Sequence, residues 1–236
     1  MDYKDFMAGY TKNFFWFKAK NELIKILVLK ACGGKKRLRI LNIGVGVGDE
    51  LEILNEFGSN YVVDKDPNAL SAIDGRFCKE KKLADACDLP YEDDFFDVVV
   101  SFDVFEHIAD DARSAGEIRR VLKKHGALVF TVPAFSFIMS SHDKALHHLR
   151  RYDKKRLDDL LRQFEKRNFY YWNSLLFIPV AIVRILKRGS KGKIDKIYLF
   201  SWINDFFYDL LAIDNFLIKR GRSFPVGLTI AGFCYK

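Results

Sequence analysis

The chain has 236 residues and a mass of 27.4 kDa, which suits one domain with its own core, or such a domain with an insertion. Apolar residues make up 49% and charged residues 30%, and this composition excludes a disordered, collagen-like or low-complexity chain. The net charge of +8 is uneven, since residues 167–236 hold 11 Lys and Arg against 4 Asp and Glu, whereas residues 1–166 hold 28 against 27. The basic excess therefore belongs to the C-terminal part.

Four cysteines, Cys32, Cys78, Cys87 and Cys234, form no C-x-x-C pair and show no zinc-site spacing with histidine. Neither a disulfide framework nor a structural metal is predicted. Charged residues from Asp2 onward interrupt the first apolar run, so no secretory signal peptide is expected. These features favour a cytoplasmic protein.

From residue 38 onward, short β-rich runs alternate with helical patterns, which is typical of a parallel sheet covered by helices. The predicted strands are 38–43, 60–64, 82–85, 96–101, 126–132 and 166–172, and the predicted helices are 49–57, 67–74, 110–123 and 154–164. The run at 96–101 is apolar on both faces, as a central strand must be. The pattern predicts an α/β fold with a doubly wound sheet.

This alternation ends after residue 172. A run without formal charge, 169–183, precedes a cluster of cations with one acid, Asp195; the cations are Arg184, Lys187, Arg188, Lys191, Lys193 and Lys196. The next segment, 197–218, is apolar except for a narrow stripe at helical spacing, formed by Ser201, Asp205, Tyr208, Ala212 and Asn215. A last strand is predicted between Phe224 and Tyr235. The sequence therefore predicts a basic, apolar helical insertion, 173–222, before that strand.

Three roles for the insertion stay open. A membrane span is disfavoured, because Pro179 and Arg184 leave less than the ~20 apolar residues needed. Two interfacial helices with cations facing anionic head groups would place the protein peripherally on the inner membrane face. An oligomer interface, giving a homo-oligomer, or a cap over the active site are the alternatives.

A glycine loop joins the first strand to a helix, in the run Ile-Leu-Asn-Ile-Gly-Val-Gly-Val-Gly-Asp-Glu-Leu. Gly44, Gly46 and Gly48 let a ligand lie directly against the backbone. Their G-x-G-x-G spacing differs from the G-x-G-x-x-G of dinucleotide sites, which argues against nicotinamide or flavin. Asp64 ends the second strand, where a carboxylate can accept hydrogen bonds from both hydroxyls of an adenosine ribose. These residues predict a nucleoside site.

The chain resembles the class I S-adenosylmethionine-dependent methyltransferases of type 11. The resemblance rests on the glycine loop, on Val-Val-Asp-Lys-Asp-Pro-Asn-Ala-Leu at 62–70, on the run 85–101, and on Asp-Val-Phe-Glu-His-Ile at 103–108. It implies a Rossmann-like seven-stranded sheet, S-adenosylmethionine as cofactor and methyl transfer as activity. It also implies the cofactor contacts: Gly44, Gly46 and Gly48 under the methionine part, Asp64 at the ribose, Asp85 and Ala86 at the adenine, and Ser101 and Phe102 near the sulfonium. Asn42 departs from the family, which often has an acidic residue there.

Two further runs resemble methyltransferases associated with surface-polysaccharide genes. They are Phe-Phe-Trp-Phe-Lys-Ala-Lys-Asn-Glu-Leu-Ile at 14–24 and His-Asp-Lys-Ala-Leu-His-His-Leu-Arg-Arg-Tyr at 142–152. The likeness itself names no substrate; the expected acceptor is a small molecule, a saccharide or a lipid-linked saccharide, methylated at oxygen. The cofactor domain then comprises 1–172 and 223–236. Trp16 and Phe17 on its N-terminal helix would form a lid over the cofactor, or would simply pack that helix.

Two histidines follow strands at the edge where open α/β sheets bind ligands, and both are candidate catalytic residues. His107 follows the fourth strand and His142 the fifth, so either could serve as a general base towards a hydroxyl acceptor, although His107 could instead cap the next helix. No metal site is expected, because His142, His147 and His148 have no further ligand at a suitable spacing. Arg150, Arg151 and Tyr152 could bind a phosphate or uronate, or begin a solvated helix.

Two functions of other classes are alternatives. The basic C-terminal part could bind RNA or DNA, which would make the protein a nucleic-acid methyltransferase. However, Ser-Phe-Asp-Val stands after the fourth strand, where base-methylating enzymes of the family carry Asn/Asp-Pro-Pro-Tyr/Phe. A non-catalytic cofactor-binding scaffold is the other alternative, against which the intact glycine loop and Asp64 argue.

Overall fold

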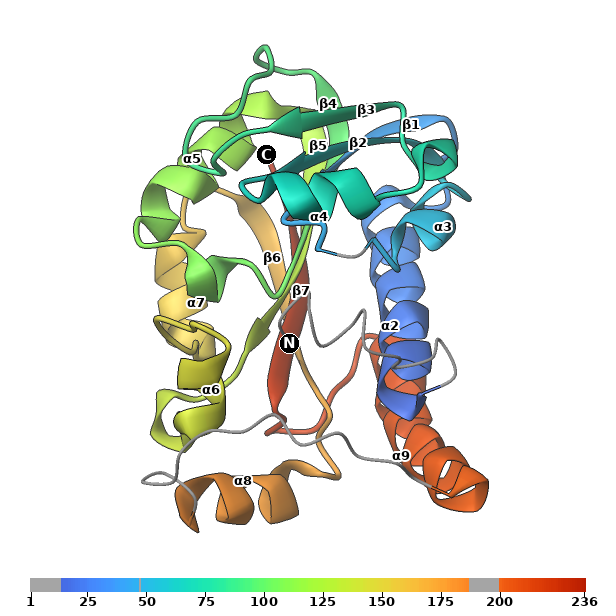
Figure 1. Ribbon diagram of the computed structural model, residues 1–236, viewed down its shortest axis with the longest axis vertical. Coiled ribbons are helices and arrows are strands. Elements are labelled where there is room, and N and C mark those ends of the chain that lie inside the picture. Colours follow the sequence, from blue (N-terminus) through green and yellow to red (C-terminus); the bar gives the residue numbers. More distant parts are fainter. Residues whose placement is uncertain (1–13, 47, 187–199) are drawn as a thin grey trace.

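The computed structural model describes residues 14–46, 48–186 and 200–236 (Figure 1). A seven-stranded sheet runs through the molecule in the order β3-β2-β1-β4-β5-β7-β6. Its strands are β1 (Leu38–Ile43), β2 (Gly58–Asp64), β3 (Glu80–Leu83), β4 (Phe96–Phe102), β5 (Leu122–Pro133), β6 (Glu165–Trp172) and β7 (Thr229–Tyr235). The first five pair in parallel, whereas β7 runs antiparallel to both β5 and β6. The predicted α/β doubly wound sheet is confirmed.

Helices cover both faces of the sheet, as Figure 1 shows. On one face α2 (Phe15–Cys32), α3 (Leu51–Leu54) and α9 (Ser201–Lys219) pack over Val98, Val100 and Val129. On the other face α5 (Asp111–Val121) and α7 (Lys154–Leu160) pack over Val99, Leu128 and Phe130. Asp66 caps the N-terminus of α4 (Pro67–Ala72), because its side chain accepts a hydrogen bond from the Asn68 backbone N. Residues of β4 thus point alternately into two separate cores, which explains its unbroken apolar run.

Along the chain, two helices, α8 (Phe177–Leu186) and α9, separate β6 from β7, where the insertion was predicted. Five of its predicted cations, from Lys187 to Lys196, fall in 187–199 and lie outside the described residues. Residues 1–13 also lie outside them. The helix that carries Trp16 and Phe17, α2, packs on the sheet, where Leu23 and Leu27 are fully buried. Within the described ranges, no helix has both the length and the apolar character to cross a bilayer.

Short elements complete the edge that carries the site. They are η1 (Gly75–Phe77), η2 (Phe105–His107), η3 (Ser136–Ile138) and α6 (Ser141–Ala145). The sequence pattern did not predict α6, because five residues show no periodicity. A capping box forms it instead: Asp143 Oδ2 accepts hydrogen bonds from the backbone N (2.9 Å) and Oγ (3.2 Å) of Ser140.

Candidate active site

The strand register gathers the candidate residues at one edge of the sheet. Ile43 pairs with Val63 of β2 and with Ser101 of β4, and Ser101 pairs with Phe130 of β5. Because these strands are parallel, their carboxyl ends meet at this edge, and the loops after them lie side by side. The glycine loop, Asp64 and the histidine-bearing segments therefore belong to one site.

The glycine loop has the backbone that its sequence predicted. Gly44, Gly46 and Gly48 all have positive φ, at 68°, 55° and 75°. A Cβ on Gly44 would lie 2.6 Å from Val104 Cγ2, and one on Gly48 would lie 2.6 Å from Ile73 Cδ1, so both positions exclude a side chain. A Cβ on Gly46 would meet no described atom within 4 Å. The loop thus packs against Val104 and Ile73 at Gly44 and Gly48, whereas no described atom covers the position of a Cβ at Gly46.

Asp64 lies directly at this loop. Its Oδ2 accepts a hydrogen bond from the Gly46 backbone N at 3.3 Å, and its Oδ1 accepts one from the Asp66 backbone N at 2.9 Å. Asn42, which departs from the family pattern, is 1% exposed and donates through Nδ2 to Glu50 Oε1 at 2.7 Å. Burial raises the pKa of Glu50, while this hydrogen bond acts to lower it. Asn42 therefore holds the end of the glycine loop through Glu50.

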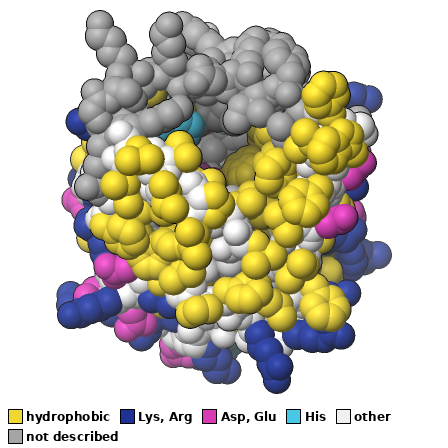
Figure 2. All heavy atoms as spheres, turned by 90° about the horizontal axis from the view of Figure 1, so that it is seen from below, with side chains coloured by type: hydrophobic (Ala, Val, Ile, Leu, Met, Phe, Trp, Pro, Cys, Tyr) yellow, Lys and Arg dark blue, Asp and Glu magenta, His cyan; other side chains and the backbone are white. Residues whose placement is uncertain are grey.

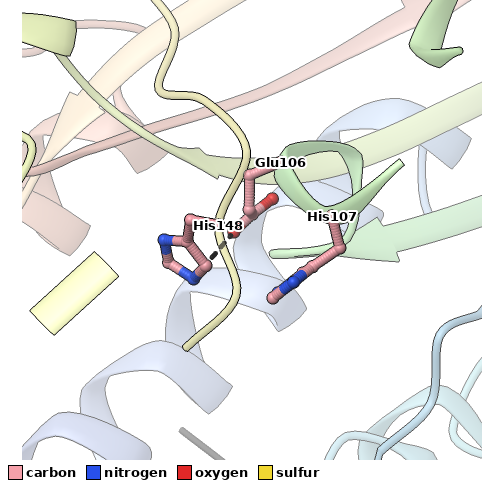
Figure 3. A group of neighbouring side chains, drawn as sticks. All are labelled: Glu106, His107 and His148. Carbon is pink, nitrogen blue, oxygen red and sulfur yellow. Dashed lines mark ion pairs between the residues drawn. The ribbon is translucent and has the colours of Figure 1, made fainter. Parts of the chain in front are cut away.

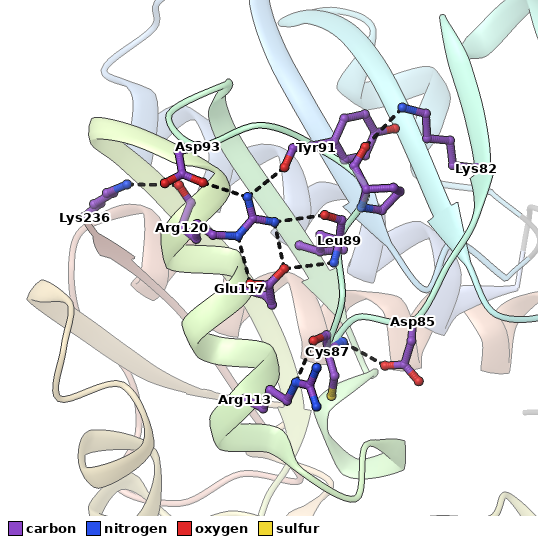
Figure 4. Close-up of polar contacts among 11 residues, drawn as sticks. Lys82, Asp85, Cys87, Leu89, Tyr91, Asp93, Arg113, Glu117, Arg120 and Lys236 are labelled. Carbon is purple, nitrogen blue, oxygen red and sulfur yellow. Dashed lines mark hydrogen bonds and ion pairs between the residues drawn. The ribbon is translucent and has the colours of Figure 1, made fainter.

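The loop that carries Asp85 and Ala86 is held by α5 (Figure 4). Arg120 donates to the backbone carbonyls of Tyr91 at 2.7 Å and Leu89 at 2.9 Å, and Glu117 accepts from the Leu89 backbone N at 2.9 Å. Asp85 accepts from the Cys87 backbone N at 2.8 Å, as Figure 4 also shows. Ala86 is buried in the core. The loop that the resemblance places at the adenine is thus held in position by side chains of α5.

The end of β4 carries a buried polar group, and a partly buried ion pair follows it. Ser101 is 1% exposed, and its hydroxyl has no hydrogen-bond partner among the described residues. Phe102 is 9% exposed, and Asp103 follows it with a φ of 55°. Lys20 of α2 lies 2.5 Å from Asp103 Oδ2. Burial acts to raise the pKa of Asp103, but Lys20 outweighs it and the pKa is lowered. Sequence reasoning missed Lys20 and Asp103.

The predicted catalytic residue His107 belongs to a cluster with Glu106 and His148, shown in Figure 3. The rings of His107 and His148 meet edge to face with centroids 4.8 Å apart, and His148 Nε2 lies 4.0 Å from Glu106 Oε1. Burial, aided by His148, lowers the pKa of His107 to about 4. Burial and Asp103 raise the pKa of Glu106 well above its usual value. Asp110, and not His107, caps α5.

The other predicted catalytic residue, His142, lies on α6. Burial, with the nearby Arg184, lowers its pKa to about 4, so its imidazole is neutral at physiological pH. Its neighbour Asp143 is fully buried and accepts hydrogen bonds from Arg151 at 2.7 Å, His148 at 3.1 Å and Arg184 at 3.1 Å. The prediction that Arg184 faces a membrane is wrong, because its guanidinium turns inward to this carboxylate.

Arg150, Arg151 and Tyr152, which could have bound an anion, each have an ion-pair or hydrogen-bond partner inside the protein. Arg150 forms an ion pair with Asp111 at 2.8 Å, and Arg151 is 2% exposed beside Asp143. Tyr152 is fully buried and donates to Asp111 Oδ2 at 2.8 Å. The hypothesis that these three side chains bind a phosphate or uronate is therefore wrong. They hold the loop after β5 against η2 and α5.

Comparison with known proteins identifies the part of the chain that carries the glycine loop and Asp64. Residues 41–130 match the family described as a methyltransferase domain. A probable S-adenosylmethionine-dependent methyltransferase of Mycolicibacterium smegmatis is 25% identical over 66% of this chain and 60% of its own. Residues 41–130 therefore carry a methyltransferase domain, and the chain is similar to S-adenosylmethionine-dependent methyltransferases.

A further relative and a solved structure are also similar to this chain. A malonyl-[acyl-carrier protein] O-methyltransferase of Geobacter sulfurreducens is 30% identical over 63% of this chain and 59% of its own. The crystal structure of a Thermotoga maritima methyltransferase superposes with a TM-score of 0.59 at 17% identity, covering 94% of this chain and 90% of that one. The chain spans between 45% and 60% of the length of the first curated relatives it matches.

The residues present fit S-adenosylmethionine, the cofactor of the family. Gly46 leaves open space where a side chain would stand, Asp64 offers a carboxylate beside it, and the buried Ser101 hydroxyl faces no partner among the described residues. In this cofactor site Asp64 would hold the ribose hydroxyls, and the loop with Asp85 and Ala86 would receive the adenine. Ser101 and Phe102 lie at the carboxyl end of β4, where the methyl-bearing sulfur is expected.

Proposed function

We propose that the protein transfers a methyl group from S-adenosylmethionine to an oxygen of a saccharide, free or lipid-linked. The observation that carries this proposal is the convergence of the glycine loop and Asp64 with a neutral imidazole at the same edge of the sheet. A sulfonium donor is already activated, so the protein must mainly align the acceptor, which supplies up to ~7–11 kcal/mol of rate enhancement. A hydroxyl acceptor also needs a group that takes its proton.

His142 is the residue we assign to that proton transfer. Its lowered pKa keeps the imidazole unprotonated, so one ring nitrogen is free to accept a proton. The ring of His107 packs against His148 and Glu106 instead, which favours His142. Arg184 and Asp143, which flank His142, hold α8 and α6 together at this place.

The insertion favours an acceptor that lies in a membrane. Near its C-terminal end α9 buries two polar side chains against the protein: Asn215 Nδ2 donates to the Ala19 carbonyl at 2.9 Å, and Asp214 accepts from the Ser174 backbone N at 2.8 Å. Its apolar side is exposed, with Trp202 at 71% and Phe206 at 55%. An exposed apolar helix face of this kind can lie on a membrane as an interfacial helix does.

A second helix extends the same face. Ile178 of α8 is 68% exposed and Leu186 is 79% exposed. Figure 2, which views the molecule from below, shows hydrophobic side chains gathered on this face with Lys and Arg around its border. Patches of this kind mark membrane or protein contacts. We propose that the face rests on an anionic membrane, at its inner surface, and brings the acceptor to the site.

Transfer of label from S-adenosylmethionine carrying a radioactive methyl group tests the function. Lipid and saccharide extracts, separated into lipid-linked and free pools, serve as acceptors for the wild type and for Asp64→Ala and His142→Gln. Labelling of a saccharide pool that both variants lower at least tenfold supports the proposal, with donor affinity kept in His142→Gln. Labelling of nucleic acid, or of no saccharide pool, would refute it.

A further inference from the structure

A buried carboxylate without a partner stands at the end of β4. Glu106 is 1% exposed, and neither of its carboxylate oxygens accepts a hydrogen bond from another described residue. Leaving a carboxylate buried in this way is costly unless a cation or a proton satisfies it. The nearest basic groups in the cluster are imidazoles, and His148 Nε2 is 4.0 Å from Glu106 Oε1, too far for a hydrogen bond. A further group that satisfies the carboxylate is therefore expected between Glu106 and the imidazoles.

Both imidazoles are held as metal-binding histidines are held. His148 Nδ1 lies 3.1 Å from Asp143 Oδ1, and since Asp143 can only accept, Nδ1 carries the proton and Nε2 has a free lone pair. His107 donates from one ring nitrogen to the backbone carbonyl of His147, which leaves its other nitrogen as an acceptor. A carboxylate or carbonyl behind each ring is the usual outer partner of a metal-ligating histidine.

The backbone fixes these three side chains relative to one another. The Leu149 backbone N donates to the Glu106 carbonyl at 2.8 Å, and the His148 backbone N donates to the Asp143 carbonyl at 2.9 Å. The loop that carries His148 is thus tied to η2, which carries Glu106 and His107, as Figure 3 shows. One ligand atom from each residue lies within 4.8 Å of the other two.

We infer that Glu106, His107 and His148 bind a divalent transition-metal ion, for which Zn²⁺ is the representative. Two histidines and one carboxylate are a recurrent ligand set of catalytic zinc and non-haem iron sites, which keep open positions for water or substrate. With metal–ligand bonds of about 2.1 Å, ligand atoms lie roughly 3.4 Å apart, so small side-chain rotations close the remaining distance. Mg²⁺ is disfavoured, because it prefers oxygen ligands.

The position of the ion suggests its role. It would lie at the carboxyl end of β4, on the side of the sheet edge where His142 also stands, so an acceptor hydroxyl could fill an open coordination position and lose its proton more easily. This role rests on the proposed function. The binding of the metal does not, and it is measured without donor or acceptor.

Isothermal titration of Zn²⁺ into chelator-treated protein tests the inference. The variants are Glu106→Gln and His148→Gln, with His147→Asn as the matched control, since His147 is an exposed neighbouring histidine and Asn tolerates its φ of 58°. The wild type is expected to bind one Zn²⁺ per chain. Both cluster variants should weaken binding by at least the ~10–100-fold seen when only an outer partner is lost, and the control should not. Co²⁺ bound to the wild type should show visible absorption bands that both cluster variants lack.

Melting curves of the metal-free proteins and binding of S-adenosylhomocysteine show whether each variant is folded. Three results would overturn the inference: no stoichiometric Zn²⁺ binding by the wild type, unchanged affinity in the folded cluster variants, or an equal loss in His147→Asn. Binding of Mg²⁺ with none of Zn²⁺ would also overturn it. If Zn²⁺ binds as expected while no saccharide is methylated, the metal site stands and the proposed function falls.

Discussion

Replacing Asp143 by Asn should lower the free energy of unfolding far more than the same substitution of an exposed Asp would. The Asp143 side chain is fully buried and accepts from Arg151, whose own side chain is 3% exposed. Asn has nearly the same shape but no charge, so the Arg151 guanidinium is left buried without its counter-ion. Breaking one partner of a buried pair typically costs about 3–5 kcal/mol of unfolding free energy. Release of Arg184 adds less, because its side chain is 20% exposed.

Urea denaturation at pH 7, with both proteins followed by circular dichroism, measures this loss. Burial alone would raise the pKa of Asp143, but His148, Arg151 and Arg184 hold it well below its usual value. Such a carboxyl binds fewer protons when folded than when unfolded, so its contribution is complete above the unfolded pKa of about 3.9 and falls away below it. The difference between wild type and Asp143→Asn should therefore shrink as the pH falls below about 4.

Asp158→Asn is the matched control, because Asp158 pairs with Arg167 at the same 2.7 Å but is 54% exposed. Its loss should be about 0–1 kcal/mol, as for surface ion pairs. If Asp143→Asn costs no more than this control at pH 7, the buried pair does not hold α6 and the following loop as described. A difference that grows as the solution is acidified would contradict the sign of the pKa shift.

Three further predictions concern the loop, the donor and the exposed face. Gly48→Ala should cost about 2 kcal/mol in urea denaturation, from its φ of 75° and its contact with Ile73, whereas Gly75→Ala, where a Cβ meets open space, should cost little; equal effects would contradict this. Asp64→Ala should weaken S-adenosylhomocysteine binding in calorimetry by ~1.5–3 kcal/mol, and unchanged affinity would move the ribose site elsewhere. The wild type should float with anionic vesicles and Trp202→Gln should float less, while Leu83→Gln, also exposed but on β3, should behave as wild type; absence of wild-type flotation would favour a cap or oligomer role.

The sheet could be predicted from the sequence because strands buried on both faces leave an unbroken apolar signal. Strand β5 shows the limit of that signal: it begins at Leu122, although the sequence predicted a helix up to residue 123 and a strand only from residue 126. Lys123 is kept in the strand by an ion pair with Asp97 at 2.6 Å, and His125 has a φ of 63°. Contacts between distant residues decide such bounds, and local pattern does not contain them.

The candidate site also has a part that the sequence predicts and a part that only the fold brings together. The glycine loop was predictable because its positive φ angles require glycine, and Asp64 because a strand must end beside it. The cluster of Glu106, His107 and His148 was not, since its members join only when the loop after β5 folds back and Leu149 bonds to Glu106. Helix α9 was predicted to be amphipathic, but its periodicity does not tell which side faces the protein. Its buried Asn215 accepts from Trp172 Nε1 at 3.0 Å, a contact that only the fold reveals.

The place of β7 between β5 and β6 sets an order of events during synthesis. On the ribosome β6 is made before β7, yet its only strand partner in the described sheet is β7. While residues 173–228 are being translated, β6 has an unpaired edge and its aromatic residues, among them Tyr171 and Trp172, lack the strand that buries them. An exposed edge of this kind invites pairing with other chains. A nascent chain paused within the insertion is therefore the state in which this protein most needs a chaperone.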